Sequence, residues 1–122
     1  MRLGFLCRVF LLPSVFVMPG CGTSEQPALG GDPEQGRLLL RQFACGGCHS
    51  IPGVANASGK VGPPLEHIAK RVYLAGVLPN TPENMAAFIR EPAAFAPRTA
   101  MPDMGVTEAH VRDMVAYLYT LK

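Results

Sequence analysis

The clearest hydrophobic pattern lies at the C-terminus, where apolar residues recur at helical spacing. They follow Thr107, which is placed as an N-cap, and occupy positions i, i+3, i+4, i+7 and i+10: Val111, Met114, Val115, Leu118 and Leu121. Glu108 lies in the first turn, where the helix dipole favours a negative charge. The pattern predicts an amphipathic helix that begins after Thr107 and has one buried face.

A second amphipathic helix is predicted near residue 32. Asp32 is a good N-cap, Pro33 suits the first helical position and Gln35 follows three residues after the cap. The helix is expected to run to about Ala44. One face gathers the residues that we expect inside, namely Gly36, Leu39, Leu40 and Phe43. A glycine on that face would let another helix approach closely.

Two further helices are predicted in the middle of the chain. Thr81, Pro82 and Glu83 start one that carries Met85, Phe88 and Ile89 on one side and ends before Pro92. Leu65–Ala75 is expected to form the other. No segment shows the alternation typical of a strand, so the predicted fold class is all-α.

The first residues differ in character from the rest. Arg2 and Arg8 flank an apolar run over residues 9–18 that is too short to span a bilayer, which is typical of a secretory signal. The run ends at Met18-Pro19-Gly20-Cys21, which resembles the lipobox of bacterial lipoproteins. The resemblance implies a signal peptide over 1–20 and a lipid anchor on Cys21. The alternative is an ordinary cleaved signal that leaves Cys21 as a free thiol.

Residues 21–31 are expected to form a flexible tether, because the stretch from Thr23 is polar and rich in Gly, Pro and Ser. Residues 32–122 then form one domain. The chain has 11 basic and 9 acidic residues, and loss of Arg2 and Arg8 with the signal leaves 9 of each. This balance argues against a nucleic-acid partner.

The cysteines carry the main chemical signal. Of the 4, Cys7 lies in the signal and Cys21 at its end, which leaves Cys45 and Cys48. A thioredoxin-like pair would need a βαβ pattern around it, and none is visible. The next residue is His49, so the segment reads Cys45-Gly46-Gly47-Cys48-His49.

This is the pattern of covalent haem c attachment. Two intervening residues set the two sulfurs about as far apart as the haem vinyl groups, and the adjacent imidazole reaches the iron. Gly46 and Gly47 remove side chains that could crowd the haem. The alternative is an incidental cysteine pair beside a surface histidine.

With this motif, the stretch from Asp32 to Lys122 resembles a class I cytochrome c, a fold in which about four short helices wrap one haem and the N- and C-terminal helices pack together. In that family the carbonyl of a Gly-Pro pair accepts a hydrogen bond from the axial histidine. Gly62-Pro63-Pro64-Leu65 matches, which implies that role for Pro63 and a haem contact for Leu65.

The resemblance also implies the sixth iron ligand. Pro97-Arg98-Thr99-Ala100-Met101 fits the family's Pro-x-Thr-x-Met setting, so Met101 would bind the iron and Thr99 would bond a haem propionate. Met104 is the competing candidate. Phe88 stands where many members carry a Tyr, and the chain has no Trp, so two of the family's polar contacts are missing.

The remaining His and Met residues have plainer interpretations. His67 is expected on a surface helix and His110 in the first turn of the last helix, and neither is favoured as an iron ligand. Met85 and Met114 fall on apolar helical faces, where methionine is ordinarily packing.

Within the class, the stretches around residues 51–54, 61–65 and 75–84 resemble a bacterial haem domain that occurs alone or fused to subunit II of haem-copper oxidases. This resemblance implies single-electron transfer on the periplasmic side of a bacterial membrane, to or within a terminal oxidase, with an upstream cytochrome reductase or dehydrogenase as donor. The alternative is a ligand-binding or peroxidase-like haem protein in which the methionine is displaceable.

Overall fold

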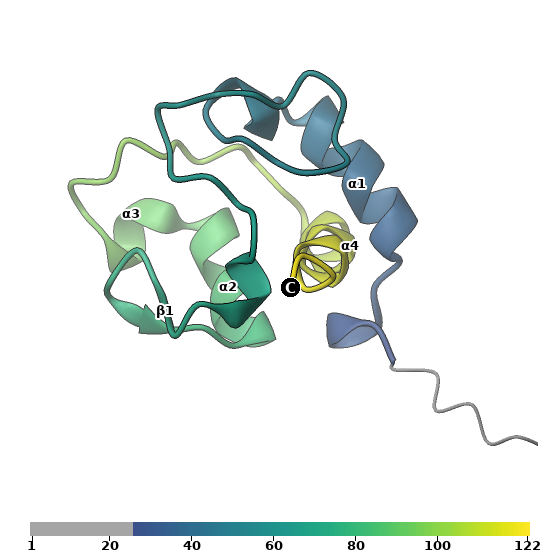
Figure 1. The fold of residues 1–122 in the computed structure, drawn as a ribbon. Helices are drawn as coiled ribbons and strands as arrows, with labels where there is room; N and C mark the ends of the chain where they lie inside the picture. Colours follow the sequence, from purple (N-terminus) through teal and green to yellow (C-terminus); the bar gives the residue numbers. More distant parts are fainter. Residues whose placement is uncertain (1–25) are drawn as a thin grey trace, which may run out of the picture.

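The computed structural model describes residues 26–122 as a helical domain (Figure 1). Its helices are α1 (Pro33–Gln42), α2 (Pro82–Arg90), α3 (Pro92–Phe95) and α4 (Glu108–Leu118). Three single 3-10 turns join them, namely η1 (Ala28–Gly30), η2 (Cys45–Gly47) and η3 (Ile68–Lys70). The two short strands are β1 (Tyr73–Leu74) and β2 (Leu78–Pro79). The all-α fold class is confirmed.

The first and last helices pack against each other, as predicted. Gly36 of α1 lies against the backbone of Asp113 in α4, and a Cβ atom at residue 36 would clash with the Asp113 carbonyl. The Asp32 backbone N–H donates to Asp113 Oδ1 over 2.9 Å, while the Asp32 side chain caps α1. The glycine predicted to admit a second helix therefore does so.

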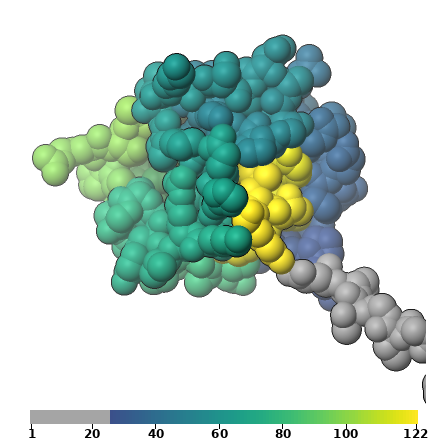
Figure 2. All heavy atoms as spheres, in the orientation of Figure 1, coloured from purple at the N-terminus to yellow at the C-terminus, as the bar shows by residue number. Residues whose placement is uncertain are grey.

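The hydrophobic core is centred on α4. Val111, Met114, Val115 and Leu118 are all buried, and Leu39, Leu40 and Met85 pack in the same cluster. Figure 2 shows α4 in yellow between the blue N-terminal part and the teal middle segment. Burial of the predicted apolar face is therefore confirmed from Val111 to Leu118, whereas Leu121 lies beyond the end of α4 and is half-buried. Met85 and Met114 serve as packing residues, as expected.

The α2 helix begins and ends where the sequence indicates. Thr81 Oγ1 accepts a hydrogen bond from Asn84 N over 3.2 Å, and Pro82 occupies the first turn. The chain bends at Glu91, and Pro92 starts the one-turn helix α3, which the sequence analysis did not anticipate. This bend turns the chain into the segment that carries Met101.

The prediction of a helix over Leu65–Ala75 is wrong. Only Ile68–Lys70 forms a 3-10 turn, with His67 in the left-handed region at φ 57° and Ala75 at φ 48°. Asn80 Nδ2 donates to the carbonyl oxygens of Ile68 and Arg71 over 2.8 and 2.9 Å, and these bonds replace helical ones. His67 is thus exposed at a turn and not on a helix.

The expectation that no strand is present is also wrong at one place. β1 and β2 pair antiparallel, with Tyr73 opposite Pro79 and Leu74 opposite Leu78. The connection uses left-handed backbone at Ala75 and at Gly76, where φ is 71°. Two-residue strands are too short to show an alternating pattern, so the sequence could not reveal them.

Residues 28–31, which were expected to be part of a tether, pack against the domain. Leu29 and Ala28 of η1 pack against the core, and Gly31 lies against the Arg112 carbonyl so tightly that a Cβ atom would clash. The expectation of a flexible tether over 21–31 is therefore wrong for residues 28–31. The predicted signal peptide over 1–20 and the predicted lipid anchor on Cys21 lie outside the described residues. Within residues 26–122, no helix combines the length and hydropathy needed to cross a membrane.

Candidate haem site

The attachment motif folds as the tight turn η2 directly after α1. Ala44 adopts the left-handed conformation at φ 54°, and the Cys48 and His49 N–H groups both donate to the Cys45 carbonyl, over 3.2 and 3.0 Å. Residues three apart eclipse each other in a 3-10 turn. The turn therefore places the side chains of Cys45 and Cys48 on one side, as two thioether bonds to one porphyrin require.

Both cysteines are half-buried free thiols. Burial, the largest effect, raises the pKa of the Cys45 thiol above its ordinary value. Cys45 and Cys48 are the residues that would hold a haem c through thioether bonds.

The two glycines of the motif meet different needs. Gly46 is buried, and a Cβ atom there would clash with the backbone of Ala57, while its carbonyl accepts from Gly59 N over 3.0 Å. Gly47 has open space around its Cα atom. Gly46 is thus required by the following loop, whereas a Cβ atom at Gly47 would meet no atom of residues 26–122 within 4 Å.

His49 is oriented by the segment that contains the Gly-Pro pair. Its Nδ1 lies 2.7 Å from the Pro63 carbonyl oxygen. A carbonyl can only accept, so Nδ1 carries the proton and Nε2 keeps a lone pair for a metal. The ring packs directly on Gly62, where a Cβ atom would overlap ring atoms Nδ1, Cε1 and Nε2.

The loop from residue 50 to 65 closes next to this histidine. Gly62 N donates to the Cys48 carbonyl and Leu65 N donates to the Ser50 carbonyl, each over 2.8 Å. Leu65 is half-buried and packs against the core cluster. The structure therefore brings together the attachment turn, His49, Pro63 and Leu65.

Met101 and Thr99 lie in the α3–α4 connection, which is the yellow-green segment of Figure 1. Thr99 Oγ1 accepts a hydrogen bond from Met101 N over 3.1 Å, which leaves the hydroxyl proton free to be donated elsewhere. Met101 is half-buried, whereas Met104 is 37% exposed. Of the two methionines, Met101 is thus the more enclosed.

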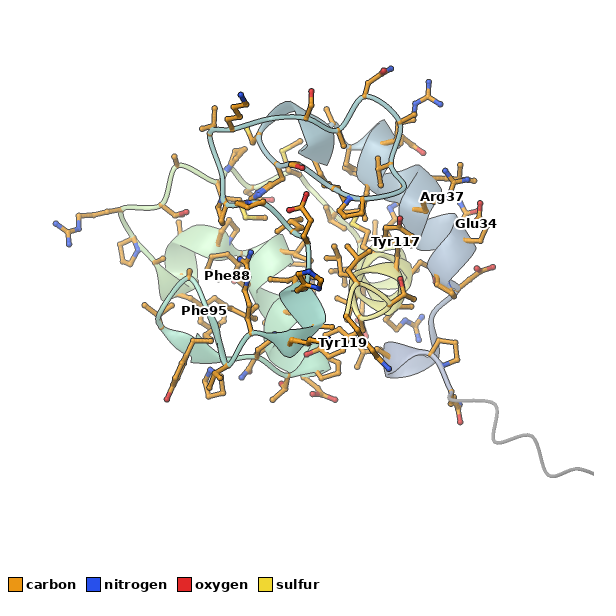
Figure 3. All side chains as sticks on the ribbon, viewed as in Figure 1. Glu34, Arg37, Phe88, Phe95, Tyr117 and Tyr119 are labelled. Carbon is orange, nitrogen blue, oxygen red and sulfur yellow. The ribbon has the colours of Figure 1, made fainter. Side chains whose placement is uncertain are left out.

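The aromatic residues near this connection come from α2 and α3. Phe88 and Phe95 form a tilted ring pair, with centroids 6.5 Å apart and ring planes at 41°. Figure 3 shows the two residues near each other, and Phe95 is 36% exposed. The pair joins α2 to α3 by an apolar contact.

The two other histidines do not join this site through any contact in the structure. His110 lies in the first turn of α4, as expected, and its ring contacts Phe43 at 5.5 Å between centroids. His67 is exposed at the start of η3.

Several contacts around the site were not foreseen from the sequence. Ser50 Oγ donates to Glu66 Oε1 over 2.8 Å, and Tyr117 OH donates to the Pro52 carbonyl over 2.5 Å. Tyr119 OH donates to Asn80 Oδ1 over 3.0 Å. These partners lie from 16 to 65 residues apart, and no local pattern marks such pairs.

The residues present fit a haem. Two thiols project from one turn, a histidine presents Nε2, and Gly62 leaves the room that its ring needs. An all-α domain built around such a turn defines the class of small proteins that bind haem c covalently.

Comparison with known proteins agrees. The cytochrome c family model matches residues 33–122. The chain is 34% identical over 89 residues to cytochrome c oxidase subunit 2 of Alkalihalophilus pseudofirmus, which covers 72% of this chain and 25% of that protein. The chain thus spans about a quarter of that relative's length. Its fold resembles cytochrome c2 from Rhodobacter sphaeroides, with a TM-score of 0.52 and 20% identity, over 75% of this chain and 96% of the other.

The chain therefore belongs to the cytochrome c family. It carries one covalently bound haem c, as class I c-type cytochromes do.

Proposed function

We propose that Cys45 and Cys48 form the two thioether bonds, that His49 Nε2 binds one face of the iron and that Met101 sulfur binds the other. The bond between His49 Nδ1 and the Pro63 carbonyl carries this proposal, because it fixes the tautomer in which Nε2 is a ligand. Leu65 supplies an apolar contact to the haem, and Thr99 donates its hydroxyl proton to a propionate.

Bound in this way, the haem supplies a change of iron charge by one electron. The residues on both faces keep water and small ligands away from the iron. The Pro63 carbonyl makes His49 a stronger donor, while the thioether of Met101 is a weak one that favours the reduced state.

We further infer that the physiological acceptor is a haem-copper terminal oxidase, to which or within which this domain delivers electrons. The similarity to an oxidase subunit 2 supports this inference. An upstream cytochrome reductase or dehydrogenase would be the donor.

We also propose that the protein is exported and held at the periplasmic side of the membrane by lipid on Cys21. The apolar run before Gly20 and Cys21 supports this proposal. A lipoprotein with several acyl chains stays firmly anchored, whereas a single chain would bind only reversibly.

Purification from detergent-solubilised membranes tests the electron-transfer proposal. We expect the protein to co-purify with an oxidase, and the pre-reduced haem to be reoxidised by that oxidase in a cyanide-sensitive reaction. The Cys21→Ser variant should lose the anchor yet remain oxidisable by added oxidase. Rapid CO binding to the reduced protein at neutral pH, without reoxidation by the oxidase, would instead indicate the ligand-binding alternative.

A further inference from the structure

Cys48, His49 and Ser50 are hydrogen-bonded to one short stretch of the following loop, residues 62–66. The Cys48 carbonyl accepts from Gly62 N, and His49 Nδ1 donates to the Pro63 carbonyl. The Ser50 carbonyl accepts from Leu65 N, and Ser50 Oγ donates to Glu66 Oε1 over 2.8 Å. The last of these bonds is made by two side chains that the haem site itself does not use.

Few bonds are available to hold this stretch in place. Pro63 and Pro64 have no backbone N–H, so neither can donate to the attachment segment. Gly62 N and Leu65 N are the backbone donors on either side of the prolines. Arg71 Nη2 also donates to the Pro64 carbonyl, from the side of η3. The Pro63 carbonyl that orients His49 is therefore held by one bond before it and by the Pro64, Leu65 and Glu66 bonds after it.

The Glu66 side chain is suited to act as the acceptor. It is exposed, and the hydrogen bond from Ser50, the largest effect, lowers the pKa of its carboxyl below the ordinary value. Glu66 is thus ionised at neutral pH, and a hydrogen bond to a carboxylate is shorter and stronger than one between neutral groups.

We propose that Ser50 and Glu66 form a positioning pair that keeps the Pro63 carbonyl on His49 Nδ1. This inference rests on the proposed role of His49 as the iron ligand. The Ser50–Glu66 bond joins the residue after His49 to the segment that carries Pro63, so its loss lets the loop separate from the imidazole. A weaker bond at Nδ1 makes the imidazole a poorer electron donor, which destabilises ferric iron.

Solvent exchange of the His49 Nδ1 proton, measured by NMR in the reduced holoprotein, reads this bond directly. Ser50→Ala should accelerate the exchange several-fold and raise the midpoint potential. The matched control is Ser58→Ala, because Ser58 faces Ser50 across a β-bridge and its exposed hydroxyl makes no hydrogen bond in the structure. It should leave both quantities at their parent values.

Variants at Glu66 separate the hydrogen bond from the charge. Glu66→Ala removes the acceptor and should accelerate the exchange as Ser50→Ala does, whereas Glu66→Gln keeps a carbonyl acceptor and should restore slow exchange. The proposal is contradicted if Ser50→Ala exchanges at the same rate as Ser58→Ala, or if Glu66→Gln behaves like Glu66→Ala. A parent holoprotein with no protected Nδ1 proton would overturn the ligand assignment as well.

Discussion

His49 is held on two sides of its ring. The Pro63 carbonyl lies 2.7 Å from Nδ1, and Gly62 gives the ring a place to lie where any side chain would intrude. One of these contacts sets the tautomer and the other sets the position. The glycine and the proline that lie thirteen and fourteen residues after His49 thus set the position and the tautomer of its ring.

Replacing Gly62 by alanine tests the second contact. The added Cβ atom would overlap the imidazole, so we expect Gly62→Ala to displace the ring, perturb the haem absorbance spectrum and shift the midpoint potential. Gly76→Ala is the control, because residue 76 lies in the β1–β2 connection, outside the attachment motif, and its Cβ atom would meet no atom within 4 Å. Equal spectra and potentials for the two variants would show that the ring does not need the space at Gly62.

The choice between Met101 and Met104 is a second question at this scale. Met101 follows Thr99, whose hydroxyl caps its backbone N–H, and the side chain is half-buried, whereas Met104 is 37% exposed. Met101→Ala should abolish the weak near-infrared band of sulfur-ligated ferric haem, open the iron to CO and lower the potential. Met104→Ala should leave all three unchanged, and the reverse pattern would move the role to Met104.

At the scale of elements, α4 holds the loop after the attachment turn. Tyr117 OH donates to the Pro52 carbonyl over 2.5 Å, and Arg37 Nη1 of α1 lies 3.4 Å from the Gly53 carbonyl. Figure 3 shows Tyr117 and Arg37 on the same side of the domain. α1 and α4 therefore hold the start of the loop, at residues 52 and 53. The end of the same loop, at residues 62 and 63, positions His49.

Removal of the Tyr117 hydroxyl should cost about 1 kcal/mol of unfolding free energy, the usual net worth of one hydrogen bond. Chemical denaturation of Tyr117→Phe measures this, with Tyr73→Phe as the control, because Tyr73 is 57% exposed and its hydroxyl makes no hydrogen bond in the structure. A loss in Tyr73→Phe equal to that in Tyr117→Phe would contradict the contact.

The same variant has a pH signature. Burial, the largest effect, raises the pKa of the Tyr117 phenol above its ordinary value. A group whose folded pKa is raised contributes stability that is present below its unfolded pKa and is lost as pH rises through the folded one. The difference between parent and Tyr117→Phe should thus be constant up to about pH 9 and shrink above the ordinary tyrosine pKa of about 10.

The sequence predicted those elements whose signals are local. Capping residues and apolar spacing located α1, α2 and α4, because Asp32, Thr81 and Thr107 bond within their own first turns. It failed over Leu65–Ala75, where Asn80 and Tyr119 supply long-range bonds that no local pattern records. It also treated residues 28–31 as tether, although Leu29 packs on the core in a left-handed conformation at φ 56°.

At the site, too, the features with a local signal could be predicted and the long-range contacts could not. The order of Cys45, Cys48 and His49 fixes the attachment chemistry, and the Pro63 contact expected from the family resemblance is present. The Ser50–Glu66 bond and the Tyr117 contact could not be predicted, because each joins residues that meet only after the loop has closed.

At the scale of the whole molecule, the helices form the core and the loops carry the candidate site residues. α1 and α4 bury the apolar core, while the segments that carry His49, Pro63 and Met101 are loops attached to that scaffold. Functional residues commonly lie on loops that a rigid scaffold positions. The chain spans about a quarter of the oxidase subunit that it resembles, so the similarity concerns that part alone and not a whole oxidase subunit.

The most direct test of this account is mass spectrometry of the purified protein after denaturation and acid-acetone extraction. We predict that the polypeptide retains the mass of one haem, that peptide mapping places it on the segment from Cys45 to His49, and that the Cys45→Ser, Cys48→Ser double variant loses it. A polypeptide that sheds its haem under these conditions, or a double variant that keeps it, would contradict the central claim.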